Sequence, residues 1–109
     1  MATVTLRDFE LTVLTAVARL GDEAYGLRIQ QDIATRHGRD YAVGAVYTTL
    51  QRLETKSLVS SRMTEPLAVR GGRARRVYKL KAAGRVALEA ARERAQSIWT
   101  DLNLGTTSR

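Results

Sequence analysis

The chain has 109 residues, 44% of them hydrophobic, with one proline, no cysteine and a formal net charge of +7. Such a chain fits one compact domain, and the lack of cysteine excludes a disulfide framework and thiolate zinc sites. No apolar run approaches the ~20 residues that span a bilayer, and the start MATVTLRDFELTV lacks the pattern of a signal peptide, so we expect a cytoplasmic protein with no membrane partner.

Most of the positive charge lies in one stretch of the chain. Residues 61–81 hold seven basic residues against one acid, whereas residues 1–40 hold five against six. Charge focused in this way favours a polyanionic partner over an evenly solubilising surface. The charged residues of the stretch are Arg62, Arg70, Arg73, Arg75, Arg76, Lys79 and Lys81, with Glu65 as the single acid.

A first helix is predicted from Thr5 and Asp8, which have the spacing of a capping box, to the residue before Gly21. A second, weaker row on this helix contains Leu11, and a monomer would leave that row exposed, so it is a candidate partner contact. The main apolar row is Leu6, Phe9, Val13, Leu14, Val17 and Leu20, and the second row is Leu11, Thr15 and Ala18.

Two further helices follow. The first is expected to be capped by Asp22 or Glu23 and to stop at His37-Gly38, with His37 close to the terminal carbonyls. The next helix has one apolar side, expected to be buried, and an outer side of short, polar and basic residues. The predicted buried residues are Leu27, Ile29, Ile33 and Ala34 in the first of these helices and Val43, Val46, Leu50 and Leu53 in the second.

Residues 58–63 and 77–80 are β-prone runs, and the loop between them contains Gly71-Gly72, which predicts a hairpin with a basic tip. A final helix of about 20 residues starts at Ala82 and carries an apolar stripe that one hairpin cannot cover. This stripe is therefore the expected dimer seam, together with Leu11. Its members are Leu88, Ala91, Ala95, Ile98, Trp99 and Leu102.

Three helices, a hairpin and a helix form, in that order, a mainly α structure of the winged helix-turn-helix class, with a hairpin that makes it α+β and terminal helices that dimerise. Residues 1–81 would form the DNA-binding region and residues 82–109 the dimerisation helix of one structural domain. For Tyr47, packing against the preceding helix and contact with DNA both stay open. The predicted contacts with double-stranded DNA are Ala45, Tyr47, Thr48, Thr49 and Arg52 on the third helix and Arg70, Arg73, Arg75 and Arg76 in the wing.

The sequence resembles the PadR family of bacterial transcription regulators over about residues 5–103. The resemblance rests on GAVYTTLQRLE at residues 44–54 with Leu58-Val59 after it, on GGRARRVYKL at 71–80 with Gly84 after it, and on Tyr25-Gly26-Leu27. The length resembles that of the family's short branch with one C-terminal helix. Ala42, Ser57 and Lys81 depart from the family's usual capping residues, each at a cost of about 1 kcal/mol at most.

The resemblance implies a homodimeric repressor that binds a pseudo-palindromic operator and, as in some members, responds to a small aromatic or phenolic effector. Trp99 and Ile98 are the candidate ligand contacts, with dimer packing as the alternative role of Trp99. No catalytic motif, metal cluster or cofactor motif is present, so no enzyme is expected. The alternatives are a winged-helix protein-interaction module without DNA binding and an RNA-binding protein, which six aromatic residues poorly support.

Overall fold

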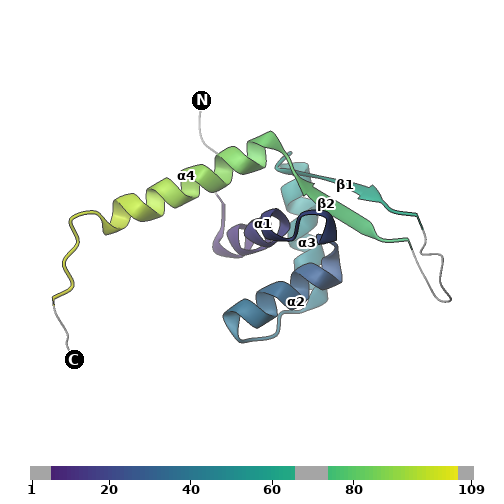
Figure 1. The fold of residues 1–109 in the computed structure, drawn as a ribbon, viewed down its shortest axis with the longest axis horizontal. Coiled ribbons are helices and arrows are strands. Elements are labelled where there is room, and N and C mark those ends of the chain that lie inside the picture. The colour runs from purple at the N-terminus through teal and green to yellow at the C-terminus, as the bar shows by residue number, and fades with distance from the viewer. Residues whose placement is uncertain (1–5, 66–73, 106–109) are drawn as a thin grey trace.

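The computed structural model describes residues 6–65 and 74–105. Figure 1 shows three helices packed together, with a hairpin on one side and a long last helix that runs away from them on the other. The winged-helix order predicted from the sequence is confirmed. The elements are α1 (Asp8–Leu20), a 3-10 turn η1 (Gly21–Glu23), α2 (Gly26–His37), α3 (Val43–Thr55), β1 (Val59–Met63), β2 (Arg76–Leu80) and α4 (Ala82–Trp99).

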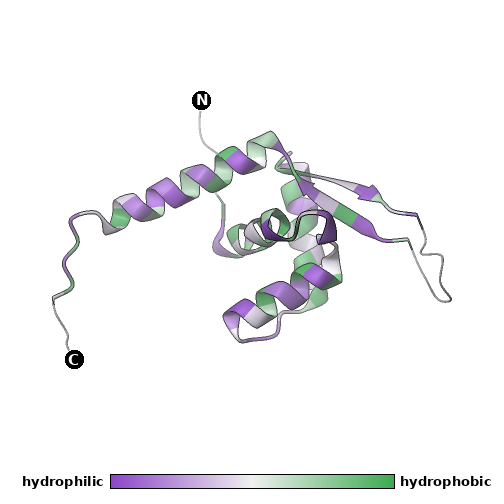
Figure 2. Ribbon diagram, in the orientation of Figure 1, coloured by the Kyte–Doolittle hydropathy of each residue, from purple (hydrophilic) through white to green (hydrophobic). Residues whose placement is uncertain are grey.

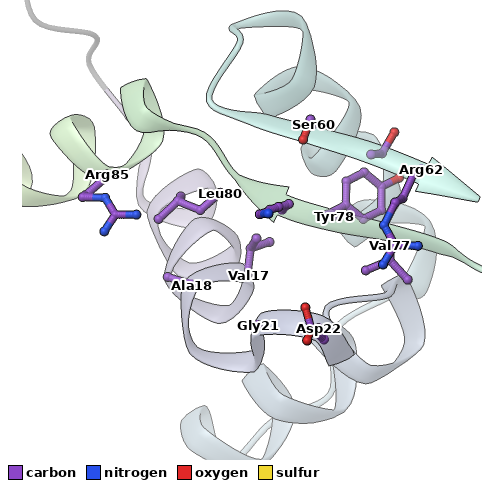
Figure 3. Close-up of a pocket in the computed structure, with 12 residues that line it drawn as sticks. Val17, Ala18, Gly21, Asp22, Ser60, Arg62, Val77, Tyr78, Leu80 and Arg85 are labelled. Atoms are coloured by element: carbon purple, nitrogen blue, oxygen red, sulfur yellow. The ribbon is translucent and has the colours of Figure 1, made fainter.

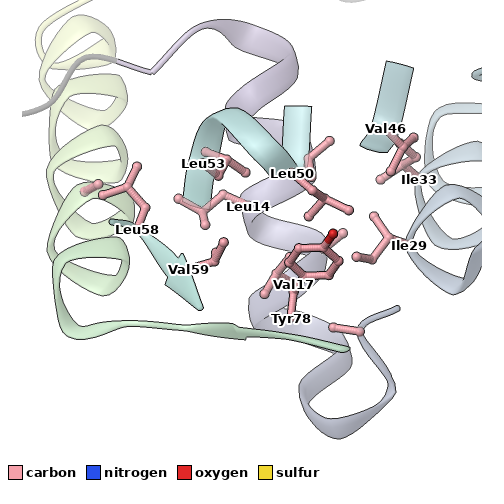
Figure 4. Packing of buried hydrophobic residues seen from close by; sticks show 14 residues of the cluster. Leu14, Val17, Ile29, Ile33, Val46, Leu50, Leu53, Leu58, Val59 and Tyr78 are labelled. Atoms are coloured by element: carbon pink, nitrogen blue, oxygen red, sulfur yellow. The ribbon is translucent and has the colours of Figure 1, made fainter. Parts of the chain in front are cut away.

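One hydrophobic core joins the three helices to the base of the hairpin. Leu14 on α1 faces Leu50 and Leu53 on α3, while the ring of Tyr78 on β2 closes the side nearest α2 (Figure 4). Burial of each fully buried aliphatic side chain contributes roughly 1.5–3 kcal/mol to the free energy of folding. This cluster therefore fixes the orientation of α3 relative to α1 and α2. Its largest fully buried members are Leu14, Ile29, Ile33, Leu50, Leu53, Leu58, Val13, Val17, Val46 and Val59.

The hairpin is also tied to the start of α2. Strands β1 and β2 are antiparallel, with Val59 opposite Leu80 and Met63 opposite Arg76. On the free edge of β2, the N–H of Tyr78 donates to the carbonyl of Ala24 at 2.8 Å. The adjacent residue Tyr25 forms a bridge with Val77. The sequence did not predict this additional edge contact, which couples the wing to the helix-turn-helix.

The two N-terminal helices begin later than predicted. At α1 the backbone N–H of Arg7 donates to the Glu10 carboxylate at 2.9 Å, so Glu10 serves the helix start and the predicted role of Asp8 is wrong. Thr5 lies outside the described residues. At α2 the residue before the helix is Tyr25, because Asp22 and Glu23 are used in η1.

The end of α2 agrees with the prediction, but its buried face is narrower. Gly38 follows His37 with a left-handed φ of 69°, as a C-terminal glycine stop requires. The ring of His37 meets Tyr41 edge-on, with 6.1 Å between centroids. Leu27 is half exposed, so its predicted place in the core is wrong, whereas Ile29 is fully buried.

At its C-terminal end α3 closes with a paired hydrogen-bond motif around Ser57. The N–H of Leu58 donates to the Leu53 carbonyl at 3.0 Å and the N–H of Ser57 donates to the Glu54 carbonyl at 2.9 Å. This is the Schellman pattern, which needs a left-handed residue, and Ser57 has a φ of 62°. At the start of α3, Ala42 provides no side-chain cap, as its residue type predicts.

Helix α4 projects from the body of the protein. Gly84 lets its first turn approach closely, because a Cβ there would collide with the carbonyl oxygen of Leu58. Farther along, polar and apolar residues alternate around a helix with little beside it (Figure 2). The radius of gyration is 16.7 Å, against about 13 Å for a compact chain of this length. The helix ends at Trp99, so the predicted helical position of Leu102 is wrong.

Candidate nucleic-acid interface

The outer face of α3 carries most of the side chains predicted to contact DNA. Ala45, Tyr47, Thr48 and Arg52 are exposed on it. Thr49 is only 4% exposed, and its predicted place on this face is wrong. Thr49 lies three residues after Val46, which places both on the same side of the helix.

Tyr47 packs its ring on the first residue of α2. A Cβ at Gly26 would overlap the Tyr47 ring and its hydroxyl, so only a glycine at position 26 allows this contact. The side chain of Tyr47 is nevertheless 45% exposed. The packing role left open from the sequence is therefore confirmed, and the exposed part of the side chain remains accessible to a ligand.

Arg75 reaches the same place from the wing. Its guanidinium lies over the ring of Tyr25, the residue before Gly26, 4.3 Å from the ring centroid. The Tyr25 side chain gives no cap to the first turn of α2, whose N–H groups carry the positive end of the helix dipole. Tyr47 and Arg75 therefore each pack on one of two adjacent residues at the uncapped start of α2, a position where helix N–H groups favour an anion.

Arg76 links the wing to the end of α3. It donates to the Ser61 hydroxyl at 3.0 Å, and Ser61 donates to the Glu54 carboxylate at 2.8 Å. In the last turn of α3, Arg52 borders a hollow of about 390 Å³. Within residues 6–65 and 74–105, neither Arg52 nor Arg75 pairs with a carboxylate. Two further predicted contacts, Arg70 and Arg73, lie outside the described residues.

A partly buried ion pair holds the end of α3 against α1. The Glu10 side chain is almost fully buried, and Lys56 donates to its two oxygens at 2.9 and 3.0 Å. Burial raises the pKa of the Glu10 carboxyl, but the Arg7 N–H and the Lys56 ammonium outweigh burial and hold that pKa below its usual value. The sequence pattern did not predict this pair. Its only signal was a charged residue between Phe9 and Leu11.

A second ion pair joins α1 to α2. Asp32 accepts from Arg19 and also lies 3.5 Å from Arg36. Burial raises the pKa of Asp32, but Arg19 and Arg36 lower it by more than burial raises it. The pKa of Asp32 therefore lies below its usual value. The pair ties the end of α1 to the middle of α2, away from the start of α2.

The residues predicted for the dimer seam fall into two groups. Leu11 and Leu88 are half-buried and Ala91 is buried within the chain itself, where α1 and α4 border a groove of about 670 Å³. The structure therefore brings the second row of α1 and the first half of the stripe together. The second group is exposed and comprises Ala95, which also lines this groove, and Ile98 (68% exposed), Trp99 (61% exposed) and Leu102, which do not.

The described residues contain neither a cluster of metal ligands nor a membrane-spanning helix. In the part of the chain that the structure describes, no three His, Asp or Glu side chains gather closely enough to hold a metal ion. Over the same ranges, no helix combines the length and apolar character of a membrane span.

A helix-turn-helix whose second helix presents a polar, basic face beside a cationic wing defines a DNA-binding transcription regulator of the winged-helix class. The model of the PadR-like family of transcriptional regulators matches residues 13–90, and the chain belongs to this family. It is therefore a transcriptional regulator and not an enzyme.

Known relatives agree with this assignment. Over 77 residues the chain is 38% identical to the transcriptional regulator Rv3488 of Mycobacterium tuberculosis, a match that covers 71% of this chain and 67% of the relative. RosR of H. salinarum is similar in structure, with a TM-score of 0.67, 26% identity and coverage of 94% of this chain and 84% of that one. A PadR family regulator from Clostridium difficile has a TM-score of 0.61, 27% identity and coverage of 81% and 88%.

Proposed function

We propose that the protein is a cytoplasmic homodimeric repressor that binds a pseudo-palindromic operator. Each α3 enters the major groove, and the two recognition helices lie about 34 Å apart on successive turns of the duplex. Ala45 and Thr48 allow close approach to the base edges, while Arg52 binds a guanine or a phosphate. Repression follows from occlusion of the promoter.

The observation that carries the proposal is the convergence of Tyr47 and Arg75 on the start of α2. The two side chains come from α3 and from the wing, yet each packs on one of two adjacent residues, Gly26 and Tyr25. A backbone phosphate placed there would accept from the Tyr47 hydroxyl, the Arg75 guanidinium and the N–H groups of α2. One phosphate would thus set the register of α3 in the groove.

Dimerisation is supported by the amount of apolar surface that one copy leaves uncovered. Ile98 and Trp99 are more than 60% exposed on a helix that leaves the body of the protein. Nearer the start of α4, Leu11 of α1 and Leu88 of α4 line the groove between the two helices. We assign residues 82–109 to the dimer contact and residues 1–81 to DNA binding.

We propose that effector control acts between the two subunits. A flat aromatic ligand between subunits would stack on Trp99 and touch Ile98, and it would change the spacing of the two recognition helices. Release from the operator would follow.

Duplex binding measured by fluorescence anisotropy over a salt series tests the DNA-binding part. We expect log K to fall linearly and steeply with log salt, because several cations replace counterions on the phosphates. Arg52→Ala is expected to weaken binding, whereas Arg94→Ala, at an exposed position on α4, is the matched control. Weak binding at low salt with no salt dependence would contradict the proposal and favour a protein-interaction module.

A further inference from the structure

A second cationic site lies on the face of the hairpin that points away from α3. The strand register places Ser60 opposite Lys79 and Arg62 opposite Val77, so these four residues share one face. That face borders a cavity of about 420 Å³, a size typical of small-molecule sites. Figure 3 shows the cavity between the hairpin and the end of α1.

The cavity has apolar walls. Val17 and Ala18 on α1 form one side, and Val77 and Leu80 on β2 form the other. Gly21 lies on the rim and turns the chain from α1 into η1 with a φ of 57°. An apolar molecular body would therefore be covered from two different elements.

The charges around the cavity are unbalanced. Arg62 comes from β1, Lys79 from β2 and Arg85 from α4, while Asp22 is the single acid in the lining. In the described residues, none of the three cations makes an ion pair or a side-chain hydrogen bond. Arg85 lies at one end of the cavity and Arg62 at the other (Figure 3), and cations that lack an acidic partner in the described residues attract an anion.

We propose that this cavity binds a small organic anion with an apolar body. The anionic group pairs with Lys79 and Arg85, since a guanidinium fork pairs with carboxylate or phosphate oxygens in two parallel hydrogen bonds. The apolar body fills the space between Val17 and Val77. The site lies within one copy of the chain and is separate from Trp99, which is absent from its lining.

Such a ligand would change the orientation of the hairpin relative to the three packed helices. The hairpin meets the helical body here through the hydrogen bond from Tyr78 to Ala24 and the bridge from Tyr25 to Val77. A molecule bound between Val77 and α1 would push on the contacts between β2 and residues 24–25. It would thereby shift Arg75, which stacks on Tyr25. Control of DNA affinity by the ligand rests on the proposed function, whereas binding of the ligand does not.

The test is a titration of the full chain, labelled with nitrogen-15, with 2-naphthoate, followed through amide chemical shifts. We expect shifts to cluster at Gly21, Asp22, Ser60 and Val77, and we expect the neutral 2-naphthamide to bind at least tenfold more weakly. The double variant Lys79→Gln, Arg85→Gln should weaken 2-naphthoate binding at least tenfold. Arg94→Gln, at an exposed position outside the cavity, is the matched control and should leave binding unchanged.

Three results would overturn the inference. Shifts that cluster at Leu11, Leu88 and Ala95 would place the ligand in the groove between α1 and α4. An undiminished affinity in a double variant with an otherwise native spectrum would remove the cations from the site. A double variant that loses duplex binding, with no 2-naphthoate binding in the wild type, would assign the cations to DNA. Wild-type duplex binding without ligand tests the proposed function separately.

Discussion

The ring of Tyr47 lies directly over Gly26, so closely that one added methyl group would overlap it. The contact joins the recognition helix α3 to the first residue of α2 and holds the Tyr47 hydroxyl beside the uncapped N–H groups of that helix. The orientation of Tyr47, a proposed DNA contact, thus depends on a glycine in the neighbouring helix.

Gly26→Ala should therefore weaken both folding and DNA binding. The added Cβ must push the Tyr47 ring away, and overpacking of this kind costs roughly 1–3 kcal/mol of unfolding free energy. Urea unfolding and duplex anisotropy measure the two effects. Gly44→Ala is the matched control, because its Cβ meets nothing within 4 Å, and it should raise stability by about 0.5–1 kcal/mol. Unchanged stability and DNA affinity in Gly26→Ala would refute this role of the contact.

Ser57→Gly should stabilise the protein. Ser57 carries a left-handed backbone with a φ of 62°, which costs a residue with a side chain about 1–2 kcal/mol. Because glycine loses more entropy on folding, we expect a net gain of about 0.5–1 kcal/mol in thermal or urea unfolding. Ser60→Gly, in the extended strand β1, is the comparison and should destabilise. A loss of stability in Ser57→Gly would show that its hydroxyl matters more than its backbone.

Stability should fall in acid in part through Glu10. The pKa of this carboxyl in the folded protein lies below its ordinary value of 4.5. Its contribution to stability is therefore complete above that value and is lost as the pH falls through the lowered pKa. Glu10→Gln should lose less stability than the wild type between about pH 5 and pH 3, whereas Glu93→Gln, at an exposed position, should follow the wild-type curve. Identical acid profiles for wild type and Glu10→Gln would contradict this assignment.

Lys56→Gln addresses the same pair from its other end at neutral pH. The variant leaves a buried carboxylate without its cation, which should cost roughly 1–3 kcal/mol of unfolding free energy. Because Lys56 follows α3 directly, duplex affinity should fall as well. Stability equal to that of the wild type would mean that the Arg7 N–H alone satisfies Glu10.

Arg75 and Tyr25 can be separated by their salt dependence. Arg75→Ala removes a phosphate contact and should lower the slope of log K against log salt by about 1. Tyr25→Leu keeps the cation but removes the ring beneath it, a loss of about 0.5–1 kcal/mol that weakens binding a few-fold with the slope retained. Equal slopes in the wild type and Arg75→Ala would exclude a phosphate contact by Arg75.

Trp99→Ala should dissociate the proposed dimer. Trp99 supplies the largest apolar side chain on the projecting part of α4, and truncation of such a residue typically costs 2 kcal/mol or more at an interface, or roughly thirtyfold in dimer affinity. Sedimentation equilibrium measures the change. Val86→Ala, also exposed but outside the predicted stripe, should leave the association unchanged. A wild-type monomer at micromolar concentration would refute the dimer.

Hydrophobic periodicity was enough to predict the order of elements, because each helix buries a regular apolar row. It did not predict where α1 and α2 begin, because a single side chain can decide a helix boundary. Glu10 accepts the capping hydrogen bond of α1, and Asp22 and Glu23 belong to η1 and do not cap α2. It also placed Leu27 in the core, although that side chain is half exposed. Local spacing does not reveal which of several polar residues the chain will use as a cap.

The sequence predicted which elements carry the candidate DNA contacts, but it predicted less well which side chains point outward and what they contact. The outward places of Ala45, Thr48 and Arg52 follow from helical geometry, and the same geometry argues against Thr49, which shares the side of Val46. The stacking of Arg75 on Tyr25 joins residues 50 positions apart, and the Glu10–Lys56 pair joins residues 46 apart. Such contacts depend on the packing of the whole chain and leave no local pattern.

Selection of bound sequences from a random duplex pool tests the central claim most directly, with the wild type compared with Arg52→Ala and with Arg75→Ala, Arg76→Ala. We predict enrichment of an inverted repeat whose half-sites lie about one helical turn apart, weakened in both variants. Failure to enrich any sequence, together with binding that does not depend on salt, would contradict the account and identify the fold as a protein-interaction module.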